Sequence, residues 1–339
     1  MSNRDDLQAA VGAEIISAAQ ADALDAFLSA RSFSPVGNDA EEVHFVRGLH
    51  DILIALGLIL FLAGLVPLGL GLLGLAAGWL LAEYFTARKR LVLPSIVLAV
   101  TVTLSGGLLG GLLSAVALDF GDVPSGVALS PPFLGAGFIA ALLFYVRFRL
   151  PFALALCAAM LVCVFLSVLE LRMPGFVGAH FGVLALVLGL VVFAAAMRED
   201  FRDPERRTLH ADNAFWLHLL AAPAIIHGLI GQQFGAGATD GAAGAAMVLG
   251  TMGVVTIVAL LIDRRALLVS GLGYFAAALG TVMQTLLASG DDFAGLTLTP
   301  LLVGAIVLII GVGWAPFRRA LLPLLPPALS TRIRPAPAD

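Results

Sequence analysis

Two histidines and a proline lie in one apolar stretch of the sequence, AFWLHLLAAPAIIHGLIGQQFG, which runs from Ala214 to Gly235. The stretch is long enough to cross a bilayer, and ionisable groups inside a membrane are costly enough to suggest a functional role. Pro223 removes one helix hydrogen bond and displaces a carbonyl, so we expect the helix to bend there. His218 and His227 would then lie near opposite membrane faces. Such a helix is suited to gating a polar cavity; the alternative is a kink that serves packing, with both rings hydrogen-bonded to neighbouring helices.

His227 is expected to lie deeper in the membrane than His218. It stands thirteen residues after Ala214, or about 20 Å at a helical rise of about 1.5 Å per residue. That depth corresponds to the outer third of the membrane, at a level similar to that of Gln284. An imidazole has a donor and an acceptor to satisfy, and hydrocarbon offers no partner for either. We therefore expect His227 to face the protein interior, with Gln284 or backbone carbonyls as partners.

Further ionisable side chains stand near the ends of apolar stretches. His50 and Asp51 lie at the inner mouth of the first stretch, where they form either an interfacial anchor or a site for a proton or substrate. Glu83 precedes the basic segment ARKR (87–90), a spacing that favours a snorkelling ion pair over a functional carboxylate. His180 is expected near the outer face.

Catalytic and cofactor-binding motifs are absent from the sequence. It contains no H-E-x-x-H, no G-x-S-x-G, no phosphate-binding P-loop and no Cys/His ligand set. Cys157 and Cys163 share one apolar segment and suit packing rather than a disulfide framework. Only one of the nineteen basic residues is a lysine, and no basic tract suits nucleic acid. We expect no cofactor, no metal and no nucleic-acid partner, and the sequence leaves open whether the chain is an enzyme.

The composition places these residues in a membrane protein. Of 339 residues, 60% are hydrophobic and 12% are charged, whereas a soluble domain is about 45–50% apolar and about 25% charged. The first residues, MSNRDDLQAAVGAEII, are acidic and have no apolar core, so we expect no cleavable signal peptide. The lipid bilayer is therefore the main partner, and the fold class is an all-α, polytopic transmembrane helix bundle.

Ten stretches meet or approach the about 20 apolar residues that a membrane-crossing helix needs. They are residues 49–66, 68–86, 91–113, 131–147, 150–170, 176–197, 214–234, 242–262, 266–288 and 295–315. The first two are separated only by Pro67 and nearby glycines. If those two form one re-entrant unit, the count falls to nine and the C-terminus changes sides.

The placement of arginine favours ten spans. Cytoplasmic loops of membrane proteins carry an excess of Lys and Arg. With ten spans and a cytoplasmic N-terminus, eighteen of the nineteen basic residues are cytoplasmic and only Arg172 lies outside. A nine-span count would place later basic loops on the wrong side. We therefore expect a multi-pass protein of the bacterial inner membrane with both termini in the cytoplasm.

Three regions follow from this topology: a cytoplasmic helical hairpin (1–46), a transmembrane bundle (47–316) and a Pro/Arg-containing cytoplasmic tail (317–339). In the hairpin, Ser17 and Gln20 have capping-box spacing, which predicts a helix start. Its apolar residues suit a small seam: Leu7, Val11, Ile15, Leu24, Phe27 and Leu28. The hairpin either docks a cytoplasmic protein partner or rests on the membrane domain. The arginines of the tail suit the anionic inner surface.

Short segments echo one another between the two halves of the chain. GLHDILIAL (48–56) opens the first span and GAHFGVLAL (178–186) the sixth, while GAGFIAAL (135–142) and GLGYFAAA (271–278) lie in the fourth and ninth. Repeats of five spans must be inverted, an arrangement common in secondary transporters. These echoes suggest a 5+5 inverted repeat, although chance matches are frequent in a chain dominated by Gly, Ala and Leu.

Glycines recur at spacings that let helix backbones approach closely. GLLGLAAG (71–78) and GGLLGG (106–111) both contain small residues four positions apart. We expect these segments to serve helix packing.

Three segments resemble a group of bacterial predicted membrane proteins of unknown function: GAEIISAAQADALDAFL, EEVHFVRGLHDILIALGL and, most distinctively, DPERRTLHADNAFWLHLLAAPAIIHGL. The resemblance spans most of the chain and implies a polytopic inner-membrane protein. It carries no activity, substrate or catalytic residue.

These observations favour a transporter-like protein for a small molecule or ion, by analogy of fold and from the scattered polar groups. One alternative is a membrane scaffold or sensor whose N-terminal hairpin docks a partner. Another is a membrane-embedded enzyme acting on lipid or isoprenoid, which clustering of Asp51, Glu83 and His218 around one cavity would favour.

Overall fold

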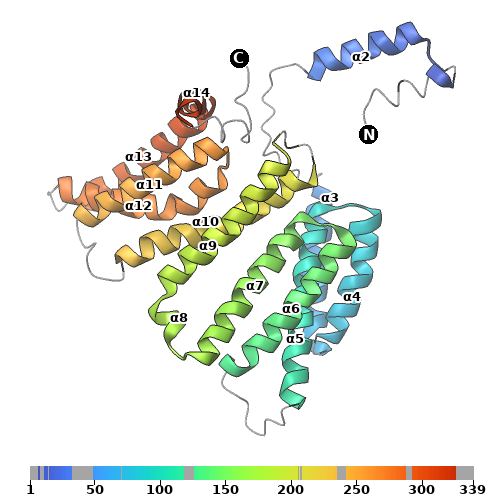
Figure 1. The fold of residues 1–339 in the computed structure, drawn as a ribbon, viewed down its shortest axis with the longest axis horizontal. Helices are drawn as coiled ribbons and strands as arrows, with labels where there is room; N and C mark the ends of the chain where they lie inside the picture. Colours follow the sequence, from blue (N-terminus) through green and yellow to red (C-terminus); the bar gives the residue numbers. More distant parts are fainter. Residues whose placement is uncertain are drawn as a thin grey trace. The chain divides into compact units, whose positions relative to one another are not determined.

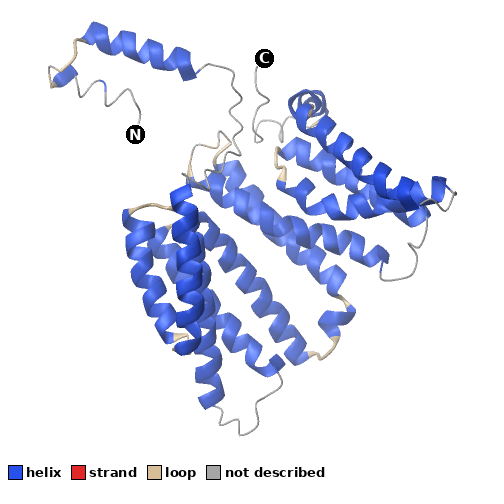
Figure 2. Ribbon diagram, turned by 180° about the vertical axis from the view of Figure 1, so that it is seen from behind, coloured by secondary structure: helices blue, strands red, loops and turns tan. Residues whose placement is uncertain are grey.

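The computed structural model describes residues 7, 11–13, 15–32, 49–69, 71–117, 126–204, 206, 208–234, 242–287 and 292–325. The chain divides into two compact units, Met1–Val43 and His44–Asp339. All regular elements of the described residues are helical, as Figures 1 and 2 show. Most of the C-terminal tail (317–339) lies outside the described residues.

The first unit contains α2 (Ala18–Ser32), and a capping box begins this helix. The backbone N–H of Ser17 donates to Oε1 of Gln20 at 2.9 Å, and the N–H of Gln20 donates to Oγ of Ser17 at 3.2 Å. These bonds satisfy two backbone donors that the first turn of a helix leaves without partners. The capping box predicted from the sequence is confirmed. Ile15 and Leu24, two residues of the expected apolar seam, are exposed.

The helices of the second unit are α3 (Leu49–Leu68), α4 (Leu72–Ala82) with its π-helical continuation (Glu83–Arg88), α5 (Val92–Ala117), α6 (Gly126–Phe148), α7 (Pro151–Arg172), α8 (Phe176–Ala179), α9 (Phe181–Arg202), α10 (Leu209–Phe234), α11 (Ala242–Ile262), α12 (Ala266–Leu287), α13 (Asp292–Val312) and α14 (Trp314–Leu321). The first two expected spans fall in separate helices, α3 and α4, and both pack on α5. Gly71 makes the turn between them with a left-handed φ of 92°, a conformation that glycine adopts without strain.

Helices α3–α7 share one apolar core. Leu62, Leu98, Val102 and Phe144 are almost fully buried in it. Glycine brings α5 and α6 close together: a Cβ on Gly106 or Gly110 would overlap Ala140 or Ala136 of α6. Gly74 and Gly78 bring α4 against α5 in the same way. The packing role predicted for both glycine-rich segments is confirmed.

The remaining helices form two further cores. The first lies among α7, α9 and α10, where α9 and α10 pack closely because Gly228 meets the backbone of α9. The second joins α10, α11, α12 and α14 around Ile226, Ile230, Val248 and Trp314. Helix α14 follows α13 after a bend of 66°.

Seven helices of the described residues are long and apolar enough to cross a membrane: α3, α5, α6, α7, α9, α10 and α11. The bent pair α13 and α14 brings this to eight if it counts as one span, and α12 is a shorter apolar helix. The outer surfaces of these helices carry many exposed Leu, Ile, Val and Phe side chains. The chain therefore fits a multi-pass integral membrane protein. The ten-span count and the inverted repeat stay predictions.

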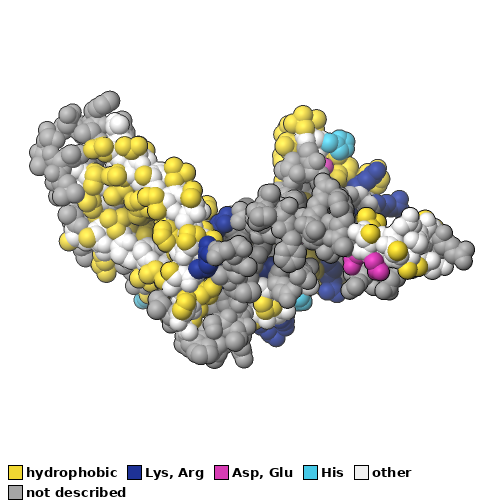
Figure 3. Space-filling model, turned by 90° about the horizontal axis from the view of Figure 1, so that it is seen from above, with side chains coloured by type: hydrophobic (Ala, Val, Ile, Leu, Met, Phe, Trp, Pro, Cys, Tyr) yellow, Lys and Arg dark blue, Asp and Glu magenta, His cyan; other side chains and the backbone are white. Residues whose placement is uncertain are grey.

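The arginine-bearing connections, apart from the one that follows Arg172 at the end of α7, lie at one end of the bundle. Contacts join them in a series: Glu83 with Arg147, Tyr145 with Asn213, Phe152 with Trp216, Arg206 with Asp263, and Asp263 with Trp314. Figure 3 views this end, where Lys and Arg side chains lie beside a broad hydrophobic surface at the left.

Candidate functional site

A carboxylate, an imidazole and a guanidinium meet at the end of the bundle that bears the arginines. Asp200 comes from the last turn of α9, His218 from α10, and Arg264 from the connection between α11 and α12. Nε2 of His218 lies 2.8 Å from Oδ2 of Asp200, and Nε of Arg264 donates to the same oxygen at 3.3 Å. Nη2 of Arg264 donates to the other carboxylate oxygen. His218 is completely buried and Arg264 is 2% exposed, so these groups interact largely away from solvent.

A second group of charges adjoins this triad. Nη2 of Arg206 donates to the backbone carbonyls of Ile262 and Asp263 at 3.2 and 2.9 Å, and its Nη1 lies 3.4 Å from the Asp263 carboxylate. Nε1 of Trp314 donates to Asp263 at 2.8 Å. Arg318, 1% exposed, approaches the same carboxylate at 4.0 Å. The α9–α10 connection, the α11–α12 connection and the start of α14 are thereby joined.

The turns that hold these groups follow from local sequence. Asp203 ends α9, and its carboxylate accepts hydrogen bonds from the backbone N–H and hydroxyl of Thr208, both at 2.7 Å. Side-chain acceptors of this kind satisfy the free donors that precede a helix. Arg206 and Asp263 occupy left-handed backbone positions with φ of 55° and 58°. Each turn therefore directs an arginine inward: Arg206 from the first, and Arg264, which follows Asp263, from the second.

The buried charges compensate one another. Charges removed from water need partners and hydrogen bonds, and removal of one partner leaves another buried without compensation. Asp200 binds two partners from different elements, His218 of α10 and Arg264 of the α11–α12 connection. Among the described residues, Nδ1 of His218 has no hydrogen-bond partner, although it is buried and Phe193 stacks edge-on at 5.1 Å. The cluster can therefore lock α9, α10 and the α11–α12 connection together, and it retains one polar atom that can accept a proton or a small polar molecule.

His227 lies nine residues further along α10, beside an apolar cavity. The cavity has a volume of about 440 Å³ and lies among α7, α9 and α10, with Cys163, Phe181, Pro223 and His227 in its lining. The ring is exposed, which corrects the expectation that it would face the interior. Its Nδ1 is hydrogen-bonded to the hydroxyl of Tyr274 on α12, and Phe181 packs against it at 5.6 Å. The ring lines the cavity, and its hydrogen-bond partner and its aromatic neighbour belong to two other helices, α12 and α9.

The side chain of Gln284, the partner expected for His227, is not among those described. Helix α10 continues through Pro223 as one helical element, and the bend at this proline stays a prediction.

The other polar residues singled out from the sequence lie apart from this cluster. Nη2 of Arg147 on α6 donates to Glu83 at 2.7 Å, so the ion pair expected for Glu83 forms across helices rather than with the basic segment that follows it. Nδ1 of His180 lies 3.0 Å from the carbonyl of Phe176 and its ring stacks on Phe176, a local arrangement. His50 is exposed at the start of α3 and Asp51 is 3% exposed.

The residues whose clustering would favour a membrane-embedded enzyme, Asp51, Glu83 and His218, belong to α3, the π-helical continuation of α4 and α10. None of these three residues lines the cavity among α4, α5 and α6, the cavity among α7, α9 and α10, or the cavity among α11, α12 and α13. Within the part of the chain that the structure describes, no group of three or more His, Cys, Asp and Glu side chains is placed to hold a metal ion. Clustering around one cavity would have favoured the membrane-embedded enzyme.

Asp200, Arg206, Asp263 and Arg264 were not predicted at a site. Their segments, REDFRDPERR (198–207) and DRR (263–265), supply basic residues that the sequence predicts to be cytoplasmic, and no further role was predicted for them. The available signal was the alternation of acidic and basic residues in both segments. Loops that only orient a protein need positive charge, whereas these segments also carry carboxylates. His218 is the residue that both the sequence and the structure place at the site.

No protein-family model matches the chain, and no curated protein or solved structure matches it. The class of protein is defined here by its own helices: a multi-pass membrane protein with a buried ion cluster at one end.

Proposed function

We propose that the chain is a transporter-like protein of the bacterial inner membrane for a small molecule or ion, with ten spans and both termini in the cytoplasm. The observation that carries the proposal is the buried Asp200–His218–Arg264 cluster. Asp200 and His218 lie in candidate membrane spans, where ionisable residues are rare and mark substrate or proton pathways.

The arrangement along α10 supports a gating role. His218 sits in the ion cluster, and His227 follows in the lining of the apolar cavity, about 13 Å away at a rise of about 1.5 Å per residue. The cluster joins segments that surround the inner end of α9 and α10. Protonation of His218 or Asp200 changes the charge balance of the cluster, and release of the α11–α12 connection would then open this end. A gate of this kind couples proton binding at the cluster to the access of a small molecule or ion to the interior of the bundle.

Topology is tested with reporter fusions. Fusions at Asp122 and Thr239 are expected to behave as periplasmic, and fusions at Asp203 and after Arg334 as cytoplasmic. Contacts between successive basic connections at one end of the bundle support this orientation, because cytoplasmic loops carry an excess of Lys and Arg. A periplasmic C-terminus would contradict ten spans.

Transport is tested with the purified chain in liposomes that contain a pH-sensitive dye. Under an imposed potassium diffusion potential, we expect faster proton entry than in protein-free liposomes. Asp200→Asn should abolish the difference, whereas Glu83→Gln, which alters an exposed ion pair, should preserve it. Equal proton entry with and without protein, across sodium, potassium and chloride gradients, would contradict proton-coupled transport.

Docking of a cytoplasmic protein by residues 1–46 is a second candidate function. The first unit is compact by itself, and Ile15 and Leu24 are 75% and 41% exposed, which leaves apolar surface for a partner. Deletion of residues 1–46 should remove a partner that co-purifies with the full chain and leave proton entry unchanged. Loss of both would show that the unit belongs to the membrane function.

A further inference from the structure

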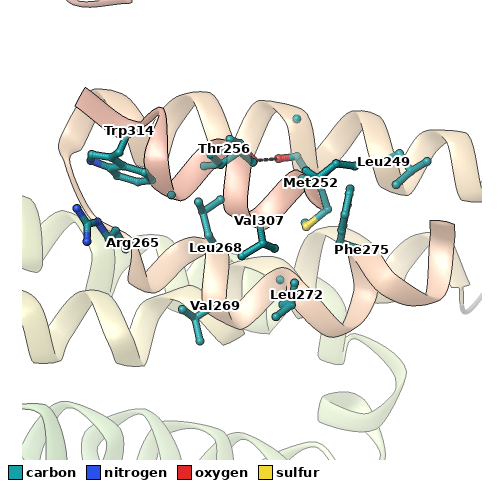
Figure 4. A pocket seen from close by; sticks show the side chains of 15 residues that line it. Leu249, Met252, Thr256, Arg265, Leu268, Val269, Leu272, Phe275, Val307 and Trp314 are labelled. Atoms are coloured by element: carbon teal, nitrogen blue, oxygen red, sulfur yellow. Dashed lines mark hydrogen bonds between the residues drawn. The ribbon is translucent and has the colours of Figure 1, made fainter. Parts of the chain in front are cut away.

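A second cavity lies among α11, α12, α13 and the start of α14 (Figure 4). Its volume of about 440 Å³ falls within the about 300–1,000 Å³ of ligand pockets. One face of α11 supplies Leu249, Met252, Gly253 and Thr256, at the spacing of a helix face. The lining is almost entirely apolar.

The cavity has one charged lining residue, Arg265, at the end where α11 and α12 are joined. Its guanidinium lies over the Trp314 ring, 5.3 Å from the centroid, and Figure 4 shows both side chains at the same end of the cavity. Arg265 follows Arg264 of the ion cluster directly, so this end of the cavity belongs to the basic end of the bundle. Aromatic and basic side chains gather at the headgroup level of a membrane.

The cavity also opens toward the outer surface of the helices. Val269 of α12 is 70% exposed and Val307 of α13 is 45% exposed, and both line it. In a membrane, such exposed apolar side chains face acyl chains. An apolar cavity with a single charged lining residue at one end matches a lipid, with one acyl chain in the cavity and a negative phosphate at the arginine.

We propose that this cavity binds an anionic phospholipid, with an acyl chain along α11 and α12 and the headgroup phosphate at Arg265. Charge complementarity selects this occupant, because a zwitterionic headgroup offsets the phosphate with its own cation. Guanidinium–phosphate hydrogen bonds are strong and geometrically specific. The site is independent of the transport proposed above, since none of its lining residues belongs to the Asp200–His218–Arg264 cluster.

Quenching of Trp314 fluorescence tests the site directly, because Trp314 lines the cavity and is only 6% exposed. Trp79→Phe and Trp216→Phe leave Trp314 as the single tryptophan of the full chain. This protein, delipidated in detergent, is titrated with phosphatidylglycerol or phosphatidylcholine that carries brominated acyl chains. We expect phosphatidylglycerol to quench at about ten-fold lower concentration, the ratio that one charge-assisted hydrogen bond supports.

Two pairs of variants separate the chain and headgroup contributions. Gly253 lines the cavity and Gly250, one turn away, does not; an added side chain meets nothing within 4 Å at either position. Gly253→Leu should abolish quenching, and Gly250→Leu should leave it unchanged. Arg265→Gln should remove the preference for phosphatidylglycerol, whereas Arg149→Gln, at an exposed arginine of another connection, should keep it. Equal quenching by the two lipids in the unsubstituted site, or quenching that survives Gly253→Leu, would overturn the proposal.

Discussion

The α6–α7 and α11–α12 connections both turn through a residue with a left-handed backbone conformation, but the arginines of the first are exposed and Arg264 of the second is buried. Arg149 and Asp263 take nearly the same left-handed conformation, with φ of 54° and 58°, so both helix pairs turn without glycine at that position. Arg149 is exposed, as is Arg147 before it, whose ion pair with Glu83 leaves the two side chains 53% and 36% exposed. Arg264, one residue after Asp263, is 2% exposed and bound to Asp200.

This difference separates two uses of positive charge at a membrane surface. An exposed arginine needs no protein partner to orient a helix pair. A buried arginine needs a carboxylate. Here that carboxylate comes from α9, so the charge pair also fixes how α9 and the α11–α12 connection pack together. The α3–α7 region is held by apolar packing and close glycine contacts, whereas α9–α14 adds a buried ion cluster that can change with protonation.

The largest expected effect is at Asp200. Asp200→Asn leaves Arg264 buried without its counter-charge, and disruption of a buried pair costs about 3–5 kcal/mol. We expect a corresponding loss in the free energy of unfolding, measured by thermal unfolding of the purified protein in detergent. Arg264→Met in the same chain should recover part of the loss, because the uncompensated charge is then removed. Unfolding unchanged by Asp200→Asn would show that the cluster contributes nothing.

A smaller effect is expected at the α5–α6 contact. A methyl group on Gly110 would overlap Ala136, whereas one on Gly111 meets only Phe133 at 3.7 Å. Gly110→Ala should therefore lower the free energy of unfolding by about 1–3 kcal/mol. Gly111→Ala, the matched control, should leave it unchanged or slightly raised because alanine favours helix. Similar stabilities for the two variants would mean that α5 and α6 do not approach through these glycines.

The smallest effect is expected at the exposed ion pair. Glu83→Gln removes a pair that water screens, and such pairs contribute about 0–1 kcal/mol. Thermal unfolding in detergent should detect little change. A loss as large as that of Asp200→Asn would erase the distinction between the two connections.

The positions of the helices followed from the sequence because apolar length is a local property. Each of the ten expected stretches lies largely within a helix or helix pair of the structure, and the Ser17–Gln20 capping box formed as predicted. The pairing of Asp200 with Arg264 did not follow, because it joins the last turn of α9 to the α11–α12 connection, 64 positions apart in the sequence. The partner of Glu83 likewise comes from another helix, α6, and no local spacing in the sequence encodes that contact.

His218 was predicted as a candidate site residue because an ionisable side chain within an apolar stretch can be recognised from the sequence alone. Its pairing with Asp200 was not predicted, because Asp200 lies on α9 in a charged segment that was expected only to be cytoplasmic. His227 shows the converse: depth was estimated from helix length alone, while exposure depends on how α10 meets α9 and α12.

Access to Cys163 tests most directly whether the Asp200–His218–Arg264 cluster closes the inner end of the bundle. Cys163 lines the cavity among α7, α9 and α10, and Cys157→Ala leaves it as the only thiol in the chain. A membrane-impermeant maleimide added to inside-out vesicles should label Cys163 slowly in this background and in the exposed-pair control Glu83→Gln. Asp200→Asn should label several-fold faster, because the connection held by Arg264 is released. Equal labelling rates in folded, membrane-inserted Asp200→Asn and its parent would contradict a gate at this cluster.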